Sequence, residues 1–157
     1  ATELSDRPSR LFGFVPGLEK TARAARGEPQ SRFRRRVRGG RVYRSELDSS
    51  YQPDAKLPAV DAPAQPRGGI VFEHWIHEPD NAIGTVMVLH GFAMGWPAID
   101  AVAMSATEWF ALGFNVILLT LPDHGPRRAP GAVLSGQRFT VPHAVRLAAA
   151  VRQAVHE

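Results

Sequence analysis

Val86-Met87-Val88-Leu89-His90-Gly91-Phe92 is the stretch that decides the fold, because it is an apolar run that ends in a polar turn containing glycine. A second run of this kind, Val-Ile-Leu-Leu-Thr-Leu-Pro-Asp-His-Gly, occupies 116–125. Both are apolar at successive positions, as in strands covered on both faces. The segment between them begins with Pro97 and is followed by Gly113, residues that favour a helix start and a helix end. The order strand, helix, strand predicts a right-handed crossover joining two parallel strands.

The other elements are predicted around this unit. β-branched and aromatic residues at 70–77 predict a strand that joins the parallel pair 85–89 and 114–121 in antiparallel orientation. Weak alternation at 41–47 predicts a first strand, and 4–25 has the pattern of a short helix. Four prolines make 52–69 a loop. The expected fold class is therefore α/β, with a mostly parallel sheet flanked by helices.

Helices are expected near 97–112 and from Pro142 onward. The first has an apolar face at three- and four-residue spacing, made by Ile99, Val102, Ala103, Ala106 and Phe110. The second has its apolar stripe at Val145, Ala148, Val151 and Val155. This second pattern reaches Glu157 without a stop signal, so we expect the helix to be cut off there.

Composition limits the classes of protein that fit. The 157 residues contain no cysteine, which excludes disulfides and thiolate metal sites. No apolar run approaches the roughly 20 residues that cross a bilayer. The chain begins at Ala1 without an apolar leader, so a cytoplasmic location is expected, with a signal peptide already removed as the alternative.

Arginines crowd the segment between Arg23 and Arg44, and the formal net charge of the chain is +4. Such a cluster binds phosphates, or it forms a surface segment that packs against acidic groups. Phe33 and Tyr43 are the only aromatic residues near it, and no nucleic-acid motif frames it. The sequence therefore disfavours nucleic acid as a partner. We assign 1–69 to an arginine- and proline-rich N-terminal arm that includes the short helix and the first strand.

His90-Gly91-Phe92-Ala93-Met94-Gly95 and Leu121-Pro122-Asp123-His124-Gly125 resemble two loops of the α/β-hydrolase superfamily, in particular its bacterial esterase- and depolymerase-like serine hydrolases. The resemblance covers about 70–157 and implies that this part is the N-terminal half of a hydrolase domain. It implies that the backbone N–H of Phe92 stabilises an oxyanion. The residues that it implies for the pocket of a small-molecule ester are His90, Gly91, Met94, Trp96, Asp123 and His124. It implies no cofactor.

The nucleophile of such an enzyme is missing from the sequence. No Gly-x-Ser-x-Gly motif is present, and Ser105 and Ser135 lack its glycines and preceding strand. Asp123 and His124 are adjacent on one turn, so the acid cannot orient the imidazole while the imidazole serves a serine. The domain is therefore expected to be truncated before the nucleophile strand, with nucleophile, acid and base outside this chain.

The resemblance also predicts which edge of the sheet is open. In this superfamily the strand ending in His-Gly-Phe lies between the strand ending in Pro-Asp-His-Gly and the nucleophile strand. One edge of 85–89 is thus expected to be unpaired and to recruit the remainder of the polypeptide or a second subunit. The alternative is a non-catalytic interaction protein that has half of this fold and binds an acidic partner through its arginines.

Metal binding is disfavoured by the placement of the histidines. His74 and His77 are three residues apart on a predicted strand, so they point to opposite faces. His90, Asp123 and His124, at the ends of neighbouring strands, are the only conceivable metal cluster.

A structural turn in another α/β fold is the plain alternative to an oxyanion loop for the segment that begins at His90.

Overall fold

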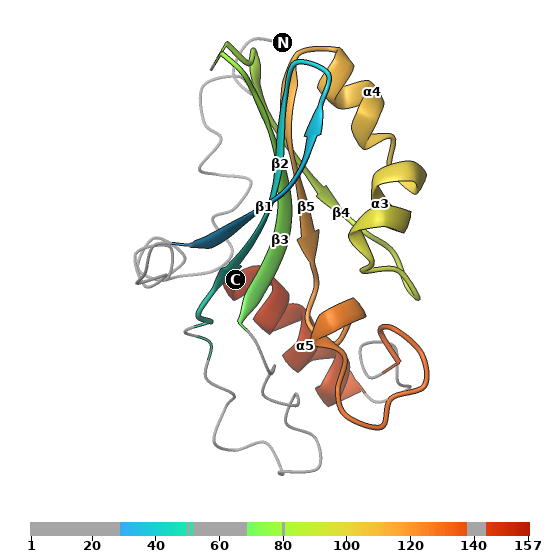
Figure 1. Cartoon of the computed structure of the whole chain (residues 1–157). Coiled ribbons are helices and arrows are strands. Elements are labelled where there is room, and N and C mark those ends of the chain that lie inside the picture. The colour runs from blue at the N-terminus through green and yellow to red at the C-terminus, as the bar shows by residue number, and fades with distance from the viewer. Residues whose placement is uncertain (1–28, 50, 52–68, 80, 138–143) are drawn as a thin grey trace, which may run out of the picture.

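The computed structural model describes residues 29–49, 51, 69–79, 81–137 and 144–157. These residues form one five-stranded sheet in the order β1-β2-β3-β5-β4 (Figure 1). The strands are β1 (Gln30–Val37), β2 (Gly40–Leu47), β3 (Ile70–His77), β4 (Gly84–Leu89) and β5 (Phe114–Thr120). The helices are α3 (Pro97–Ala103), α4 (Ala106–Ala111), the 3-10 turn η1 (Gly125–Arg127) and α5 (Ala144–His156).

The expected mostly parallel sheet flanked by helices is wrong. β1 with β2, β2 with β3 and β3 with β5 are antiparallel, and only β4 with β5 is parallel. The reason lies in the connections, since β1 turns directly into β2 through Arg38 and Gly39. A parallel pair needs a crossover of a dozen or more residues, usually helical. Among the described elements, only the segment between β4 and β5 supplies one.

The pairings predicted around this crossover are confirmed. β4 lies parallel to β5 from Gly84 opposite Phe114 to Leu89 opposite Leu119. β3 pairs antiparallel to β5, with Trp75 opposite Val116. The predicted first strand at 41–47 is present within β2, whereas β1 was not predicted. The sheet includes strands from both sides of the boundary expected at 69/70 between the N-terminal arm and the rest of the chain. The expected short helix at 4–25 and the segment 52–68 of the expected loop lie outside the described residues.

The helix expected over 97–112 is broken into α3 and α4 at Ser105. Ser105 has φ 53°, a left-handed conformation that ends one helix and re-aims the next. This break shifts the buried face, so Ala106 and Phe110 are buried as expected while Ile99 and Val102 are 58% and 82% exposed. α3 and α4 still pack on one face of the sheet, along β5 (Figure 1).

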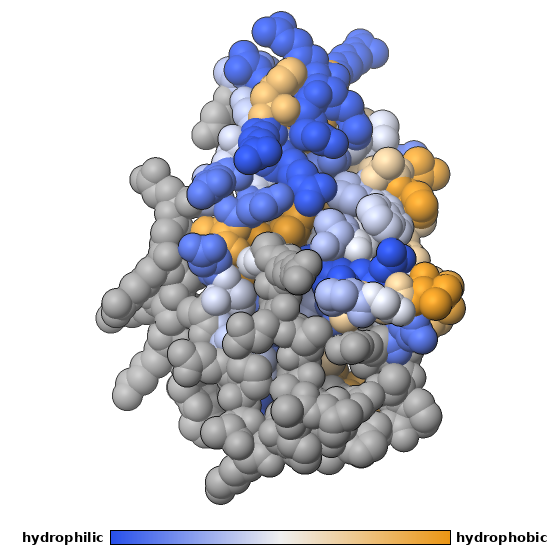
Figure 2. All heavy atoms as spheres, turned by 60° about the horizontal axis from the view of Figure 1, so that its bottom comes forward, coloured by the Kyte–Doolittle hydropathy of each residue, from blue (hydrophilic) through white to orange (hydrophobic). Residues whose placement is uncertain are grey.

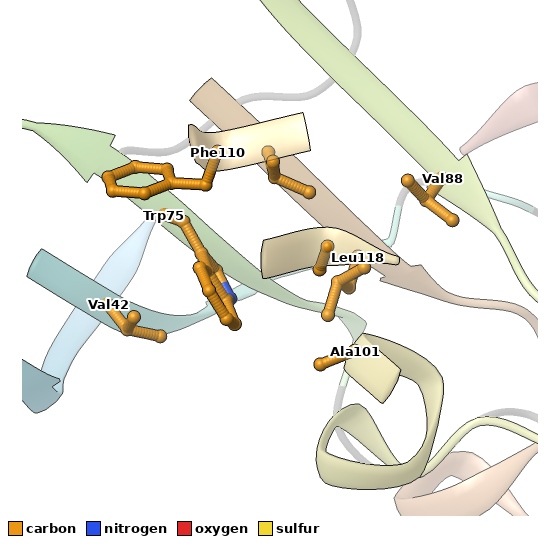
Figure 3. Packing of buried hydrophobic residues seen from close by; sticks show 8 residues of the cluster. Val42, Trp75, Val88, Ala101, Phe110 and Leu118 are labelled. Carbon is orange, nitrogen blue, oxygen red and sulfur yellow. The ribbon is translucent and has the colours of Figure 1, made fainter. Parts of the chain in front are cut away.

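The core lies between these helices and the sheet (Figure 3). The register places Val42 of β2 opposite Trp75 of β3, and Trp75 opposite Val116 of β5, so their side chains share one face. Phe110 of α4 meets the Trp75 ring edge-to-face at 5.8 Å. The described core is therefore built on one face of the sheet.

α5 lies at the lower end of the sheet, near η1 (Figure 1). Its buried side is formed by Ala149, Ala150 and Gln153, while Val151 and Val155 of the expected stripe are 44% and 54% exposed. That stripe is therefore not a core face in this structure, and the side chains of Val145 and Ala148 lie outside the description. Over the described ranges, no helix has the length and apolarity needed to cross a membrane.

Candidate functional site at the carboxyl ends of β4 and β5

Two loops follow the parallel strands, and they meet at one end of the sheet. Loop A (residues 90–96) follows β4 and leads into α3, and loop B (residues 121–137) follows β5. The rings of His90 in loop A and His124 in loop B are 4.8 Å apart. The sequence predicts this meeting, because the carboxyl ends of parallel neighbours lie on the same side of a sheet.

His90 ties the two strand ends together. Its Nε2 accepts the backbone N–H of Leu121 at 3.0 Å, so the hydrogen must sit on Nδ1. Nδ1 donates that hydrogen to the Gly91 carbonyl at 3.0 Å. Both ring nitrogens are therefore used, and the side chain is only 6% exposed. His90 is built into the fold as a neutral linker, with no nitrogen left for a metal or a substrate.

Glycines allow loops A and B to touch. A Cβ on Gly95 would lie 2.8 Å from Cβ of His124, and a Cβ on Gly125 would lie 1.9 Å from the Gly95 carbonyl oxygen. A Cβ on Gly136 would lie 2.1 Å from Nε2 of His124. All three glycines have positive φ. Any side chain at these positions would force the loops apart.

Ser135 is a further link between the loops. Its hydroxyl accepts the Gly125 N–H at 2.8 Å and donates to the Met94 carbonyl. The side chain is buried and its hydrogen is committed to that carbonyl. The contacts of Ser135 are therefore structural.

Asp100 supports loop A from α3 and was missed by the sequence analysis. Its Oδ1 accepts the Gly95 N–H at 3.1 Å, and the carboxyl is 3% exposed. Burial raises the pKa of Asp100, and the hydrogen bonds from the amides of Gly95 and Trp96 partly offset the effect. The available signal was an acidic residue in the first turn of a helix that follows a glycine loop.

Asp123 and His124 lie inside loop B. Nδ1 of His124 donates to the Pro122 carbonyl at 2.8 Å, and the ring is 2% exposed. Burial lowers the pKa of His124, the hydrogen bond to the Pro122 carbonyl partly opposes this shift, and the positive charge of Arg127 adds to it. Asp123 has φ 60°, and its carbonyl accepts the Gly136 N–H at 2.9 Å. Both residues therefore shape the backbone of the loop.

The solvent-facing part of the site comes from loop A. Phe92 and Trp96 are 54% and 43% exposed, Gly91 is exposed, and Met94 is half-buried. Across the described ranges, no acceptor takes the backbone N–H of Phe92. Ala93 has φ 63°, an uncommon conformation for alanine that turns the chain sharply after Phe92. Loop A thus presents an N–H donor beside two exposed aromatic side chains.

The described histidines do not form a metal centre. In the part of the chain that the structure describes, no group of three or more His, Cys, Asp or Glu side chains is placed to hold a metal ion. His77 Nε2 lies 3.1 Å from the Phe110 carbonyl, on the core side of the sheet. His74 points to the other side, where its Nε2 lies 3.1 Å from the Ser45 hydroxyl.

That Ser45–His74 contact is a serine–histidine pair that the sequence analysis missed. Ser45 also contacts the Ser31 hydroxyl at 2.7 Å, so the three side chains form a hydrogen-bonded row across β1, β2 and β3. Ser45 is completely buried, so its hydroxyl cannot reach a substrate. Burial lowers the pKa of His74, which favours the neutral ring in this row. We assign the row to cross-strand stabilisation.

No protein-family model matches the chain, and a search of curated proteins finds no similar sequence.

Proposed function

We propose that this chain supplies the oxyanion-stabilising loop of a serine hydrolase that cleaves carboxylic esters, with nucleophile, acid and base outside this chain. The observation that carries the proposal is the backbone N–H of Phe92. It has no acceptor among the described residues and sits in an exposed loop at the carboxyl end of β4.

The chemistry requires such a donor. Attack on an ester carbonyl produces a tetrahedral oxyanion, which preorganised N–H groups stabilise. In the enzymes that loop A resembles, a second N–H follows the nucleophile. β4 is the last strand of the described sheet, with β5 on its other side. The unpaired edge of β4 is where a nucleophile strand would pair, which would bring the second donor next to Phe92.

The site residues divide into two roles in this proposal. Gly91, Phe92, Met94 and Trp96 contact the substrate, because they supply the accessible surface of loop A. The buried residues His90, Asp123 and His124 hold loops A and B in position. Substitution of one of these buried residues is therefore expected to lower activity by displacing the backbone N–H of Phe92.

The isolated chain provides the first test. Without an activated serine, it is expected to hydrolyse no p-nitrophenyl acetate above background and to take no label from a fluorophosphonate probe. Stoichiometric labelling of Ser31, Ser105 or Ser135 would show that the chain has its own nucleophile.

The second test uses the chain together with a downstream segment or partner that carries Gly-x-Ser-x-Gly. Phe92→Pro removes the N–H, whereas Phe92→Ala keeps the N–H and removes only the ring. We expect kcat to fall about 100- to 1000-fold for the proline variant, with a much smaller change for alanine. Circular dichroism checks that both variants fold. Equal losses in two folded variants would contradict a role for the N–H.

A further inference from the structure

We propose that β1 binds an extended acidic peptide as an additional strand of the sheet. β1 is the terminal strand opposite β4, so one row of its backbone N–H and C=O groups faces outward. Seven of its eight residues are exposed, and the eighth, Val37, is half-buried. An extended peptide alongside would satisfy these backbone groups, which is how peptides add to open sheet edges.

The positive charge of β1 favours an acidic partner. Arg32, Arg34, Arg36 and Arg38 have no acidic partner in the described part of the chain. Neighbouring arginines do have partners: Arg35 lies 3.7 Å from Glu73, Arg41 lies 2.7 Å from Glu78, and Arg44 lies 3.4 Å from Glu46. The unpaired guanidinium groups are therefore concentrated on the edge strand and its turn, where they favour carboxylates.

The arrangement of these arginines favours a peptide over a flat polyanion. Arg32 lies opposite Arg44, which lies opposite Glu73 in line with the core residue Leu118, so Arg32 lies on the α3–α4 face of the sheet. Arg36 lies opposite Arg41 in the β1–β2 register, on the other face of the sheet. The register shifts at Arg34, between Phe33 and Arg35. A duplex or a bilayer laid against one face would leave the charges of the other face unmatched. A strand beside β1 projects alternate side chains to both faces and reaches both sets.

Figure 2 shows hydrophilic side chains gathered at the upper end of the molecule, where the β1–β2 hairpin turns in Figure 1. One aromatic residue of β1, Phe33, is 55% exposed, and its ring meets Tyr43 edge-to-face at 6.0 Å. Single-stranded nucleic acids are bound on several stacking side chains. β1 has only one, so this edge strand itself offers charge and backbone pairing more than base stacking.

The test measures binding of labelled peptides to the whole chain by fluorescence anisotropy. The probe is the eight-residue peptide Glu-Glu-Thr-Thr-Glu-Glu-Thr-Thr, which is equal in length to β1 and projects carboxylates to both faces of the sheet. A peptide with Lys in place of Glu tests charge, and one N-methylated at alternate residues tests backbone pairing. We expect only the unmodified acidic peptide to bind, and more weakly as salt rises. Equal binding of the N-methylated peptide would overturn the proposed strand addition.

Paired variants locate the site. Arg34→Gln/Arg36→Gln removes two charges from β1, and Arg128→Gln/Arg152→Gln removes two exposed charges elsewhere. We expect the first pair to weaken peptide binding about tenfold and the second pair to leave it nearly unchanged. Equal weakening by both pairs would overturn the assignment to β1. Tighter binding of duplex DNA or of phosphatidylserine vesicles than of the peptide would identify a flat polyanion instead. None of these results bears on the hydrolase proposal, because β1 and β4 are opposite edges of the sheet.

Discussion

At the scale of single residues, loops A and B pack closely because the glycines at their contacts have no side chain. Gly125 touches the carbonyl of Gly95, and Gly136 touches the ring of His124. His90 and His124 are buried and hydrogen-bonded to backbone atoms. Loops A and B therefore cannot shift to make space for an added side chain. The position of the Phe92 N–H therefore depends on contacts that no ester substrate would touch.

Gly125→Ala and Gly131→Ala form a matched pair that tests this packing. Both glycines have positive φ, 47° and 79°, so both substitutions strain the backbone. A Cβ on Gly131 meets nothing within 4 Å, whereas one on Gly125 meets the Gly95 carbonyl oxygen at 1.9 Å. We expect Gly131→Ala to lower the free energy of unfolding by about 1 kcal/mol. Gly125→Ala should cost about 2 kcal/mol more. Urea unfolding measures both, and equal losses would contradict the loop contact.

Two histidines whose pKa is lowered in the folded state, His124 and His74, predict a pH dependence of stability. The pKa of His124 and of His74 is lowered in the folded state, so protonation favours the unfolded chain. Their stabilising contribution is complete above the unfolded pKa of about 6.5 and decreases as pH falls below it toward the folded values. We expect the free energy of unfolding to decrease between about pH 7.5 and pH 5.5. His124→Gln should reduce this slope, and an unchanged slope would show that the ring is already solvated.

At the scale of elements, the sequence predicted what local patterns encode. Two apolar runs separated by a helix-length segment predicted the parallel pair β4–β5 and the meeting of loops A and B. β1 was missed because arginines occupy successive positions and hide the two-residue alternation. The break at Ser105 has no sequence signature, since serine seldom adopts positive φ. Asp100 was missed because its role depends on a loop that folds back onto α3.

The edge strand β4 carries a prediction of its own. It contains no charged residue or proline, and Met87 and Leu89 are 59% and 53% exposed. Such an edge pairs with other strands. Met87→Lys is expected to reduce self-association of the purified chain, measured by sedimentation velocity. The control is Val102→Lys, which places the same charge on an 82%-exposed helical residue. A monomeric parent chain, or an equal effect of both variants, would contradict association through β4.

At the scale of the whole molecule, a buried ion pair joins η1 to α5. Arg127 Nη2 lies 2.6 Å from Glu157 Oε2, and each side chain is 1% exposed. Arg127 Nη1 also donates to the Thr120 carbonyl at 2.9 Å, at the end of β5. Ser49 and Gln153 donate to Glu157 Oε1 at 2.7 and 2.9 Å. This cluster therefore connects Ser49, just after β2, and the end of β5 with Gln153 of α5 and Glu157, the residue after it.

Arg127→Met is expected to destabilise the fold strongly, because it leaves the Glu157 carboxylate buried without a counter-charge. Breaking such a pair on one side costs about 3–5 kcal/mol. Arg41→Met breaks the Arg41–Glu78 pair, where the side chains are 38% and 45% exposed, and should cost far less because solvent screens it. Urea unfolding compares the two variants. Similar losses would mean that the Arg127–Glu157 pair contributes no more than a surface contact.

The unlike edges of the sheet also limit the stoichiometry of any self-assembly. If β4 of one copy met β1 of the next, each addition would leave a new β4 free, and the chain of copies would grow into an open polymer. That contact would place the guanidinium groups of β1 against Met87 and Leu89. The guanidinium groups would lose hydrating water without gaining an opposite charge, which is unfavourable. β4 against β4 meets no such penalty and leaves only the arginine edges outside. If copies of this chain pair through β4, we therefore expect the pairing to end at two chains.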